Sequence, residues 1–235
     1  MSEAVSLLYA DGDIAVAVKP AGLVSQASSR GDSFMSALSS AVGGELYPVH
    51  RLDRETSGVM VYARTQAAAA SLSASFSQGE VKKYYLAVVL GTPEEPSGEY
   101  RDLLYHDARR NKSYVVACPR RGVRDAQLFY RVCGQHGMAT LVAVRLGTGR
   151  THQIRVQFAS RGTPVYGDRR YGGKPDEKRW GDTPDSFRGI ALACASITFP
   201  HPSKIETISF EYTPTGAPWD HFDIGDAARQ FPLLP

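Results

Sequence analysis

The sequence predicts an α+β protein with a largely antiparallel sheet. Short apolar and β-branched runs, separated by turn residues, recur along the 235-residue chain, and this spacing is typical of antiparallel strands. Only a few segments between these runs carry helix start and stop signals. The length suits one large domain or two small ones, and we expect residues 1–235 to form a single catalytic domain.

The first third of the chain is predicted to alternate strands with two helices. Strands are expected at residues 7–10, 14–18, 46–49, 59–63 and 81–90. The first two form a hairpin, because Asp11-Gly12-Asp13 between them is a turn sequence. One helix is expected to begin at a cap on Asp32 or Ser33 and to run through Ala41, and a second to follow Thr65 and end before Gly79.

The remainder is predicted as further strands around one helix. Strands are expected at residues 113–117, 127–132 and 138–145, with residues 133–137 joining the last two as a hairpin. Thr151 is the expected N-cap of a helix from His152 to Arg161. The pattern assigns nothing to residues 213–235, which we expect to pack on the surface.

Composition excludes several classes of protein. Hydrophobic residues make up 43% of the chain and charged residues 22%, as in ordinary soluble proteins. We expect a cytoplasmic location and no membrane partner, because the sequence shows neither an apolar run of membrane-spanning length nor a leader. Cys118, Cys133 and Cys194 are too few and too far apart for a disulfide framework or a zinc site, and are expected to be small buried residues.

Positive charge is concentrated in two loops, although the net charge is only +3. The first contains Arg109, Arg110, Lys112, Arg120, Arg121 and Arg124, and the second contains Arg169, Arg170, Lys174, Lys178 and Arg179. Such loops suit the phosphates of a nucleic acid. The alternative is two solvated loops without a ligand.

Residues 50–58, His-Arg-Leu-Asp-Arg-Glu-Thr-Ser-Gly, place four formal charges between two apolar runs. Asp53 lies between two arginines, which favour its ionised form, so Asp53 is a candidate nucleophile or base. A charged surface turn is one alternative. Another is a hydrolase that uses Asp53 and Glu55 as paired carboxylates on a glycosidic bond.

Two further stretches are as distinctive. The strand at 81–90 contains Lys83, Tyr85 and Ala87 at alternate positions, and residues 146–155 read Leu-Gly-Thr-Gly-Arg-Thr-His-Gln-Ile-Arg. The second stretch makes a strand-to-helix turn, where free backbone N–H groups suit an anion.

Together these stretches resemble the RluA-type pseudouridine synthases, whose motifs are H-R-L-D-x-x-T-S-G, K-x-Y-x-A and L-x-T-G-R-T-H-Q-I-R. The resemblance covers about residues 6–212, with Val18 where the family usually has Asn and Gln157 where His is commoner. The lysine of the family's N-K-P-A-G segment matches Lys19, which either braces the active-site loop or, as we expect, is an exposed hairpin lysine. We expect no S4 RNA-binding domain, because the hairpin begins within ten residues of Met1.

The resemblance implies a mixed, mostly antiparallel sheet with flanking helices and a central cleft. It also implies isomerisation of uridine to pseudouridine in RNA, either rRNA or tRNA, without a cofactor or metal. We expect a monomer. Asp53 would be the essential carboxylate, Tyr85 an active-site residue and Arg150 the partner of the aspartate, with His152 supporting the loop. The residues expected to bind RNA are Arg51, Arg54, Lys83, Arg109, Arg110 and Arg155. A catalytically silent RNA-binding protein or assembly factor of the same fold is the alternative.

Overall fold

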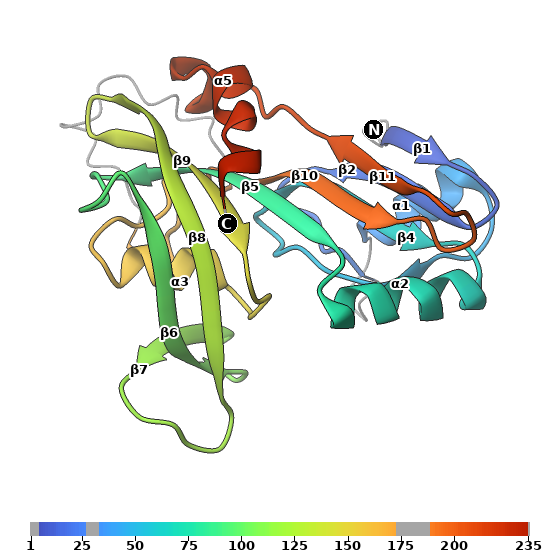
Figure 1. Cartoon of the computed structure of the whole chain (residues 1–235), viewed down its shortest axis with the longest axis horizontal. Coiled ribbons are helices and arrows are strands. Elements are labelled where there is room, and N and C mark those ends of the chain that lie inside the picture. The colour runs from blue at the N-terminus through green and yellow to red at the C-terminus, as the bar shows by residue number, and fades with distance from the viewer. Residues whose placement is uncertain (1–4, 27–32, 173–188, 235) are drawn as a thin grey trace. The chain divides into compact units, whose positions relative to one another are not determined.

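The structure is a computed structural model that describes residues 5–26, 33–172 and 189–234 (Figure 1). The chain forms two compact units, one of Met1–Lys83 with Ala193–Tyr212 and one of Tyr84–Leu192 with Thr213–Pro235. Four residues named above lie outside the described ranges: Asp32, the alternative helix cap, and Lys174, Lys178 and Arg179 of the second basic loop.

The first unit is built on a sheet in which most neighbours are antiparallel. Its strands, in spatial order, are β1 (Ser6–Ala10), β2 (Ile14–Lys19), β4 (Ser57–Ala63) and β10 (Leu192–Pro200), with β3 (Tyr47–Pro48) beside β4 and β11 (Thr207–Glu211) beside β10. The β4–β10 pair is parallel. The expected hairpin of β1 and β2 is confirmed.

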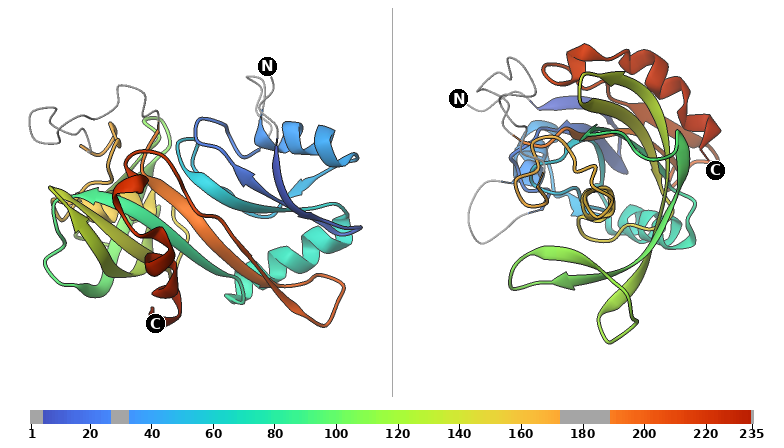
Figure 2. Two further views of the ribbon diagram at one scale, coloured as in Figure 1. Left: turned by 90° about the horizontal axis from the view of Figure 1, so that it is seen from above. Right: turned by 90° about the vertical axis from the view of Figure 1, so that its left-hand side faces the viewer.

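Two helices cover the faces of this sheet (Figure 2). Alternate residues of a strand point to opposite faces, so Val61 of β4 packs with Leu72 of α2 (Gln66–Gln78), whereas Tyr62 contacts Phe34 of α1 (Phe34–Val42). Both helices have the expected caps. Ser33 accepts a hydrogen bond from the N–H of Ser36, and Thr65 accepts one from Ala68.

The segment before the charged loop differs from the prediction. We expected a buried strand at 46–49, but β3 has two residues and its burial is partial. Pro48 has no N–H to continue the ladder, and the chain leaves the sheet after it. The charged loop therefore starts at a sheet edge and ends inside β4, which begins at Ser57.

Gly58 of β4 is required by the parallel pair with β10. Its φ is +120°, a conformation that residues with a side chain rarely adopt. A Cβ at this position would lie 2.3 Å from the carbonyl oxygen of Cys194. The glycine that ends the charged loop thus allows β4 and β10 to approach.

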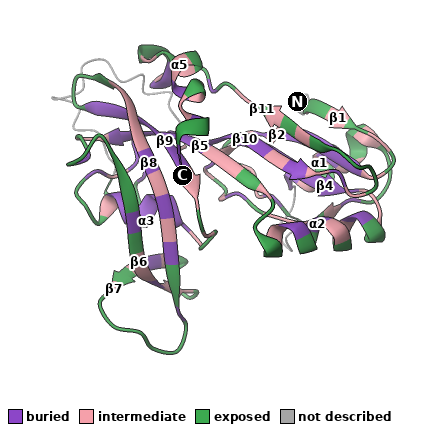
Figure 3. Cartoon of the chain, viewed as in Figure 1, coloured by how far each residue is buried: buried purple, intermediate pink, exposed green. Residues whose placement is uncertain are grey.

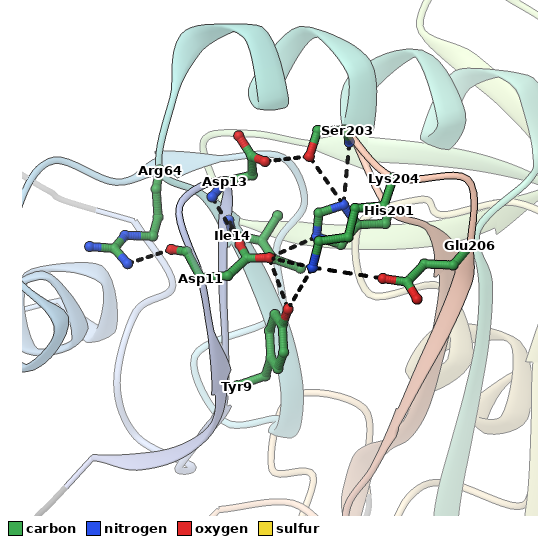
Figure 4. A network of polar contacts seen from close by, with 9 residues as sticks. All are labelled: Tyr9, Asp11, Asp13, Ile14, Arg64, His201, Ser203, Lys204 and Glu206. Atoms are coloured by element: carbon green, nitrogen blue, oxygen red, sulfur yellow. Dashed lines mark hydrogen bonds and ion pairs between the residues drawn. The ribbon is translucent and has the colours of Figure 1, made fainter.

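A polar network ties the β1–β2 turn to the turn between β10 and β11 (Figure 4). Asp11 accepts hydrogen bonds from the N–H groups of Asp13 and Ile14 and contacts His201 at 2.9 Å and Lys204 at 3.1 Å. Burial would raise the pKa of Asp11, but the hydrogen bonds from the N–H groups of Ile14 and Asp13 and from the side chains of Tyr9 and Lys204 together hold it well below its ordinary value. The ionised carboxylate therefore joins two hairpins far apart in the sequence.

The second unit contains an antiparallel sheet. Its strands, in spatial order, are β5 (Lys82–Leu90), β9 (Ala139–Leu146), β8 (Val123–His136), β6 (Ser97–Asp107) and β7 (Lys112–Val116). The expected hairpin at 127–145 is confirmed, although β8 starts earlier and ends later than predicted. Figure 3 shows that the far end of this sheet, around β7, is largely exposed.

Helix α3 (Gln153–Ala159) packs on one face of the second sheet through Phe158, which contacts the rings of Tyr100 and Tyr130. The helix is shorter than the predicted span of 152–161. Its N-cap is His152 in a left-handed conformation, so the prediction of Thr151 as the cap is wrong.

The C-terminal segment covers the other face with η1 (Trp219–His221), α5 (Ile224–Arg229) and η2 (Phe231–Leu233). Phe231 stacks on Tyr84 of β5, with ring centroids 4.9 Å apart. Trp219, Phe231 and Leu234 are buried. The segment to which sequence patterns assigned nothing therefore contributes to the core.

The α+β prediction is confirmed. Of the cysteines, Cys194 is buried as expected and Cys133 is half-buried. Cys118 is exposed, and the prediction that it is buried is wrong, because it lies in the loop after β7 rather than in a strand.

Candidate active site

Asp53 lies in the first unit, on the irregular loop between β3 and β4. Its side chain is half-buried, whereas Arg51 and Arg54 on either side are exposed. The carbonyl of Asp53 accepts a hydrogen bond from the N–H of Thr56, which closes a turn before β4. The loop thus presents the Asp53 carboxylate with an exposed arginine on each side, and Glu55 follows on the same loop.

The segment after β2 holds the backbone on both sides of Asp53. On one side, the hydroxyl of Ser25 donates to the carbonyl of Leu52 at 2.8 Å and accepts from its N–H at 3.1 Å. On the other, the N–H of Gly22 donates to the carbonyl of Arg54 at 2.7 Å, and Arg54 Nε donates to the carbonyl of Gly22 at 2.8 Å. A loop that would otherwise be free is therefore fixed at two residues that flank the carboxylate.

Lys19, at the end of β2, completes this attachment. We expected an exposed lysine, but its exposed fraction is 0%. The ammonium donates to the carbonyls of Pro20 and Leu23, each at 2.8 Å, and of Arg54 at 3.2 Å. Burial lowers the pKa of Lys19 to about 8, against the opposing pull of Asp53 and Glu55. Lys19 thus braces the active-site loop, the reading that we had placed second.

His50 begins the motif and has a structural position. Its Nε2 accepts a hydrogen bond from the N–H of Val61 at 3.0 Å, and its ring stacks on Phe76 of α2 with centroids 5.1 Å apart. Burial, and then the charge of Lys83, lower the pKa of His50 to about 3. The neutral imidazole therefore replaces a backbone carbonyl beside β4, where the chain leaves the sheet.

Lys83 was predicted to bind RNA, and its surroundings argue against that role. The ammonium lies 5.5 Å from the ring centroid of Phe76, on the same ring that His50 contacts. Burial lowers the pKa of Lys83, so its charge is partly removed from water. The lysine of the K-x-Y-x-A motif packs against α2 in the first unit.

Tyr85 and Arg150 both lie in the second unit. Tyr85 of β5 has an exposed fraction of 4% and pairs with Val144 of β9. Tyr84, its neighbour, faces the C-terminal segment through Phe231. Tyr85 therefore points to the opposite face of the sheet, because side chains of consecutive strand residues alternate.

The turn that carries Arg150 is held together by the side-chain amide of Gln153. The side-chain oxygen of Gln153 accepts hydrogen bonds from the N–H of Arg150 and the hydroxyl of Thr148, at 2.9 and 2.7 Å. Gln153 also donates to the carbonyl of Gln127 at 2.9 Å. Arg150 is exposed and its Nε donates to the carbonyl of Asp125 at 2.8 Å. The turn holds the guanidinium at the surface of the second unit.

Arg155 was also predicted to bind RNA, but the structure gives it another role. Its guanidinium donates to both carboxylate oxygens of Asp168, at 2.6 and 3.0 Å, and its exposed fraction is 2%. A buried arginine with a bidentate carboxylate partner is held for structure, which argues against a phosphate contact. The pair fixes α3 to the segment after it.

Arg109 and Arg110 lie at the turn between β6 and β7 and are exposed. Asp107 accepts hydrogen bonds from the N–H groups of both residues, at 3.0 and 3.2 Å, so the turn is ordered while the guanidinium groups face solvent. In the loop after β7, Arg120 stacks on Tyr105 at 4.9 Å. We call this exposed end of β6, β7 and β8, residues 107–124, the basic arm.

The sequence indicated the charged residues of the site but not the contacts that Ser25, Gln153 and Gln127 make. Ser25 could have been noticed as a polar residue beside a K-P-A-G segment, but nothing in the sequence shows that its hydroxyl reaches Leu52.

Within the described parts of the chain, no three His, Cys, Asp or Glu side chains are grouped as metal ligands. In the same residues, no helix is both long and apolar enough to cross a membrane.

Residues 13–160 match the sequence model of the family described as RNA pseudouridylate synthase. An uncharacterized RNA pseudouridine synthase of Aquifex aeolicus is 35% identical over 225 residues, 88% of this chain and 68% of the relative. A protein of Xanthomonas campestris named ribosomal large subunit pseudouridine synthase D is 36% identical over 215 residues, 86% of this chain and 64% of the relative.

The fold has solved counterparts. The structure of human RNA pseudouridylate synthase domain containing 1 matches with a TM-score of 0.72 at 24% identity, covering 89% of this chain and 83% of that one. At this identity the likeness concerns the fold. This chain spans about two thirds of the length of the two bacterial relatives.

The charge of Lys19 is expected to respond to the carboxylates of the loop. In an NMR titration of the side-chain 13Cε signal, Lys19 should titrate near pH 8 rather than at the ordinary lysine value of 10.5. Asp53→Asn should lower this pKa further, because it removes an attractive charge. Glu45→Gln is the control and should leave the pKa of Lys19 unchanged.

The lowered pKa of Lys19 also determines how the stability of the fold changes with pH. The unfolded chain keeps the Lys19 proton up to about pH 10.5, while the folded chain releases it near 8. Folding therefore becomes more favourable through this group as pH rises between the two values.

In the NMR titration, a Lys19 signal that titrates with the surface lysines, or that is unchanged in Asp53→Asn, would contradict the contact described above.

Proposed function

Because the chain belongs to the RNA pseudouridylate synthase family, we propose that it isomerises particular uridines of a structured RNA to pseudouridine. The observation that supports this most is the backbone attachment of Leu52 and Arg54, which holds the Asp53 carboxylate on an otherwise irregular loop. Such preorganisation is what a reacting group needs. The family consists of isomerases, and this chain carries the motif letter for letter at its fixed positions.

The proposed chemistry breaks the N-glycosidic bond, turns the uracil and joins C5 to the ribose C1′. Asp53 is the essential carboxylate, and it adds to the base, attacks C1′ or removes the C2′ proton. Each route begins from an ionised acid. Arg150, which inherits the family's aspartate-pairing role, would keep this acid ionised and oriented. We propose that no cofactor or metal takes part, since no electrons or phosphates are exchanged.

Tyr85 is proposed to stack on the target base and to help remove the C5 proton. Its burial beside β9 and its orientation away from the C-terminal segment support this role. The uridine must leave its stack to reach these groups, at a cost of a few kcal/mol that is lowest in loops and bulges. A structured RNA with such an unpaired uridine, in rRNA or tRNA, is therefore the proposed substrate.

The basic arm is proposed to bind the RNA backbone. Arg109 and Arg110 are exposed on an ordered turn, which suits phosphate contacts that position an RNA without reading its sequence. Arg51 and Arg54, exposed beside Asp53, are proposed to contact phosphates near the target. We propose that the protein acts as a cytoplasmic monomer, with both units of the chain forming one catalytic domain.

Asp53→Asn is expected to abolish isomerisation while RNA binding survives, because the amide keeps the shape of the side chain but cannot act as an anion. The measurement is a map of pseudouridine in total RNA, by carbodiimide adducts and reverse-transcription stops. Cells lacking the gene are complemented with wild type, Asp53→Asn or Glu55→Gln. We expect stops that vanish in the deletion to return with wild type and with Glu55→Gln only.

Two outcomes would count against this assignment. Restoration of the stops by Asp53→Asn would favour a catalytically silent RNA-binding protein. Equal loss in Glu55→Gln would favour a site with paired carboxylates, as in the hydrolase alternative.

Tyr85→Phe is expected to lower the single-turnover rate on the mapped RNA by about 100-fold or more, because the ring can still stack but the hydroxyl cannot assist proton transfer. Tyr84→Phe is the matched control. Its ring contact with Phe231 needs no hydroxyl, so its rate should stay near that of wild type. Both variants should keep the thermal midpoint within a few degrees, and loss of rate in the control alone would shift the assignment to Tyr84.

Arg110→Gln is expected to weaken RNA binding. It should also make the fall of log K with log salt less steep, by about 0.7 to 0.9, which is the effect of one lost phosphate contact. Arg229→Gln is a matched control, because both arginines are highly exposed and pair with an aspartate three residues away. Filter binding at several salt concentrations gives both slopes. Identical slopes for the two variants would argue against the arm as an RNA contact.

A further inference from the structure

Ser25 is a buried polar residue that lies outside the three motifs. It follows the segment that contains Lys19 and Gly22, and its exposed fraction is 4%. One hydroxyl oxygen satisfies both backbone groups of Leu52, by donating to the carbonyl at 2.8 Å and accepting from the N–H at 3.1 Å. Leu52 is the residue immediately before Asp53, and it is itself buried.

The position of Ser25 is fixed from the core of the first unit. Its carbonyl accepts a hydrogen bond from the hydroxyl of Tyr62 at 2.6 Å. Tyr62 lies in the middle of β4, is fully buried and contacts Phe34 of α1. Burial raises the pKa of Tyr62, so its hydroxyl remains a donor at every pH at which the protein would be assayed. The sheet therefore holds Ser25, and Ser25 holds Leu52.

We propose that Ser25 is a positioning residue for the Asp53 carboxylate, an inference that rests on the proposed function. The hydroxyl of Ser25 does for Leu52 what a neighbouring strand would do, because it provides both a donor and an acceptor. Among the described residues, no backbone group pairs with Leu52. Without the hydroxyl, two buried backbone groups lose their partner, which is unfavourable unless the loop moves or water enters. Movement of the loop displaces Asp53, and entry of water loosens the backbone to which Asp53 is attached.

The expected consequence lies in the chemical step. A displacement of about 1 Å at a reacting group can lower the rate by about 100-fold. Ser25 is buried, whereas the arginines proposed to bind RNA are exposed. Ser25→Ala should therefore lower kcat by about 10- to 100-fold and change the dissociation constant for RNA by less than about twofold. Ser25→Thr keeps the hydroxyl and should recover most of the rate.

The test compares three variants of the full chain with wild type. The substrate is total RNA from cells lacking the gene, labelled with 5-tritiated uridine. Tritium release is followed over several turnovers with RNA in saturating excess over the protein, which gives kcat. Ser33→Ala is the matched control. Ser33 is also a buried serine of the first unit, and its hydroxyl caps α1 by accepting from the N–H of Ser36 at 3.1 Å. It should lower the thermal midpoint without lowering kcat.

A second readout does not depend on activity. Amide hydrogen exchange of Leu52, measured by NMR, should accelerate in Ser25→Ala and stay as in wild type in Ser25→Thr and Ser33→Ala. Unchanged exchange at Leu52 in Ser25→Ala overturns the proposal. So does a normal kcat in that variant, or an equal loss of kcat in Ser33→Ala.

The two proposals fail in different ways. If wild-type protein releases no tritium, the proposed function is wrong, and the catalytic role of Ser25 is wrong with it, while amide exchange still shows whether the hydroxyl holds Leu52. If wild type is active and Ser25→Ala loses rate without faster exchange at Leu52, the proposed function stands and the positioning role does not.

Discussion

The first unit depends on the attachment of an irregular loop to the segment that follows β2. A loop has no ladder of its own, so its buried backbone groups need partners from elsewhere. Lys19, Gly22 and Ser25 supply them within seven residues, and they reach both neighbours of Asp53. The backbone on both sides of the Asp53 carboxylate is in this way fixed, although the loop belongs to no strand.

Several residues of the charged motif serve the fold rather than the chemistry. His50 replaces a backbone carbonyl beside Val61 and can do so only as the neutral imidazole, which burial ensures. Gly58 leaves the space in which β4 approaches Cys194 of β10. The ends of the motif therefore determine how the chain leaves β3 and enters β4. Asp53 lies between them, and the residues on both sides of it are held by hydrogen bonds.

The sequence predicted those elements whose signals are local. The first hairpin, α2 with its Thr65 cap and the β8–β9 pair follow from turn residues, caps and alternation of apolar residues. It failed at the start of α3, where the N-cap is His152 in a left-handed conformation rather than Thr151, and it failed where distant residues decide. The motif identified Asp53, but the burial of Lys19 and the reach of Ser25 depend on contacts across about 30 residues, which no local pattern contains.

The cations named by the sequence separate into two groups once burial is known. Arg155 pairs with Asp168 inside the second unit, and Lys83 packs on Phe76 in the first. Arg109 and Arg110 are exposed on an ordered turn, and Arg51 and Arg54 are exposed beside Asp53. Arg155 is buried and Lys83 is half-buried against a ring. Such a cation loses hydration and depends on its protein partner, so it has less to offer a phosphate, whereas an exposed guanidinium on a rigid turn can exchange water for one. Burial, more than motif membership, therefore decides which of these residues are candidates for binding RNA.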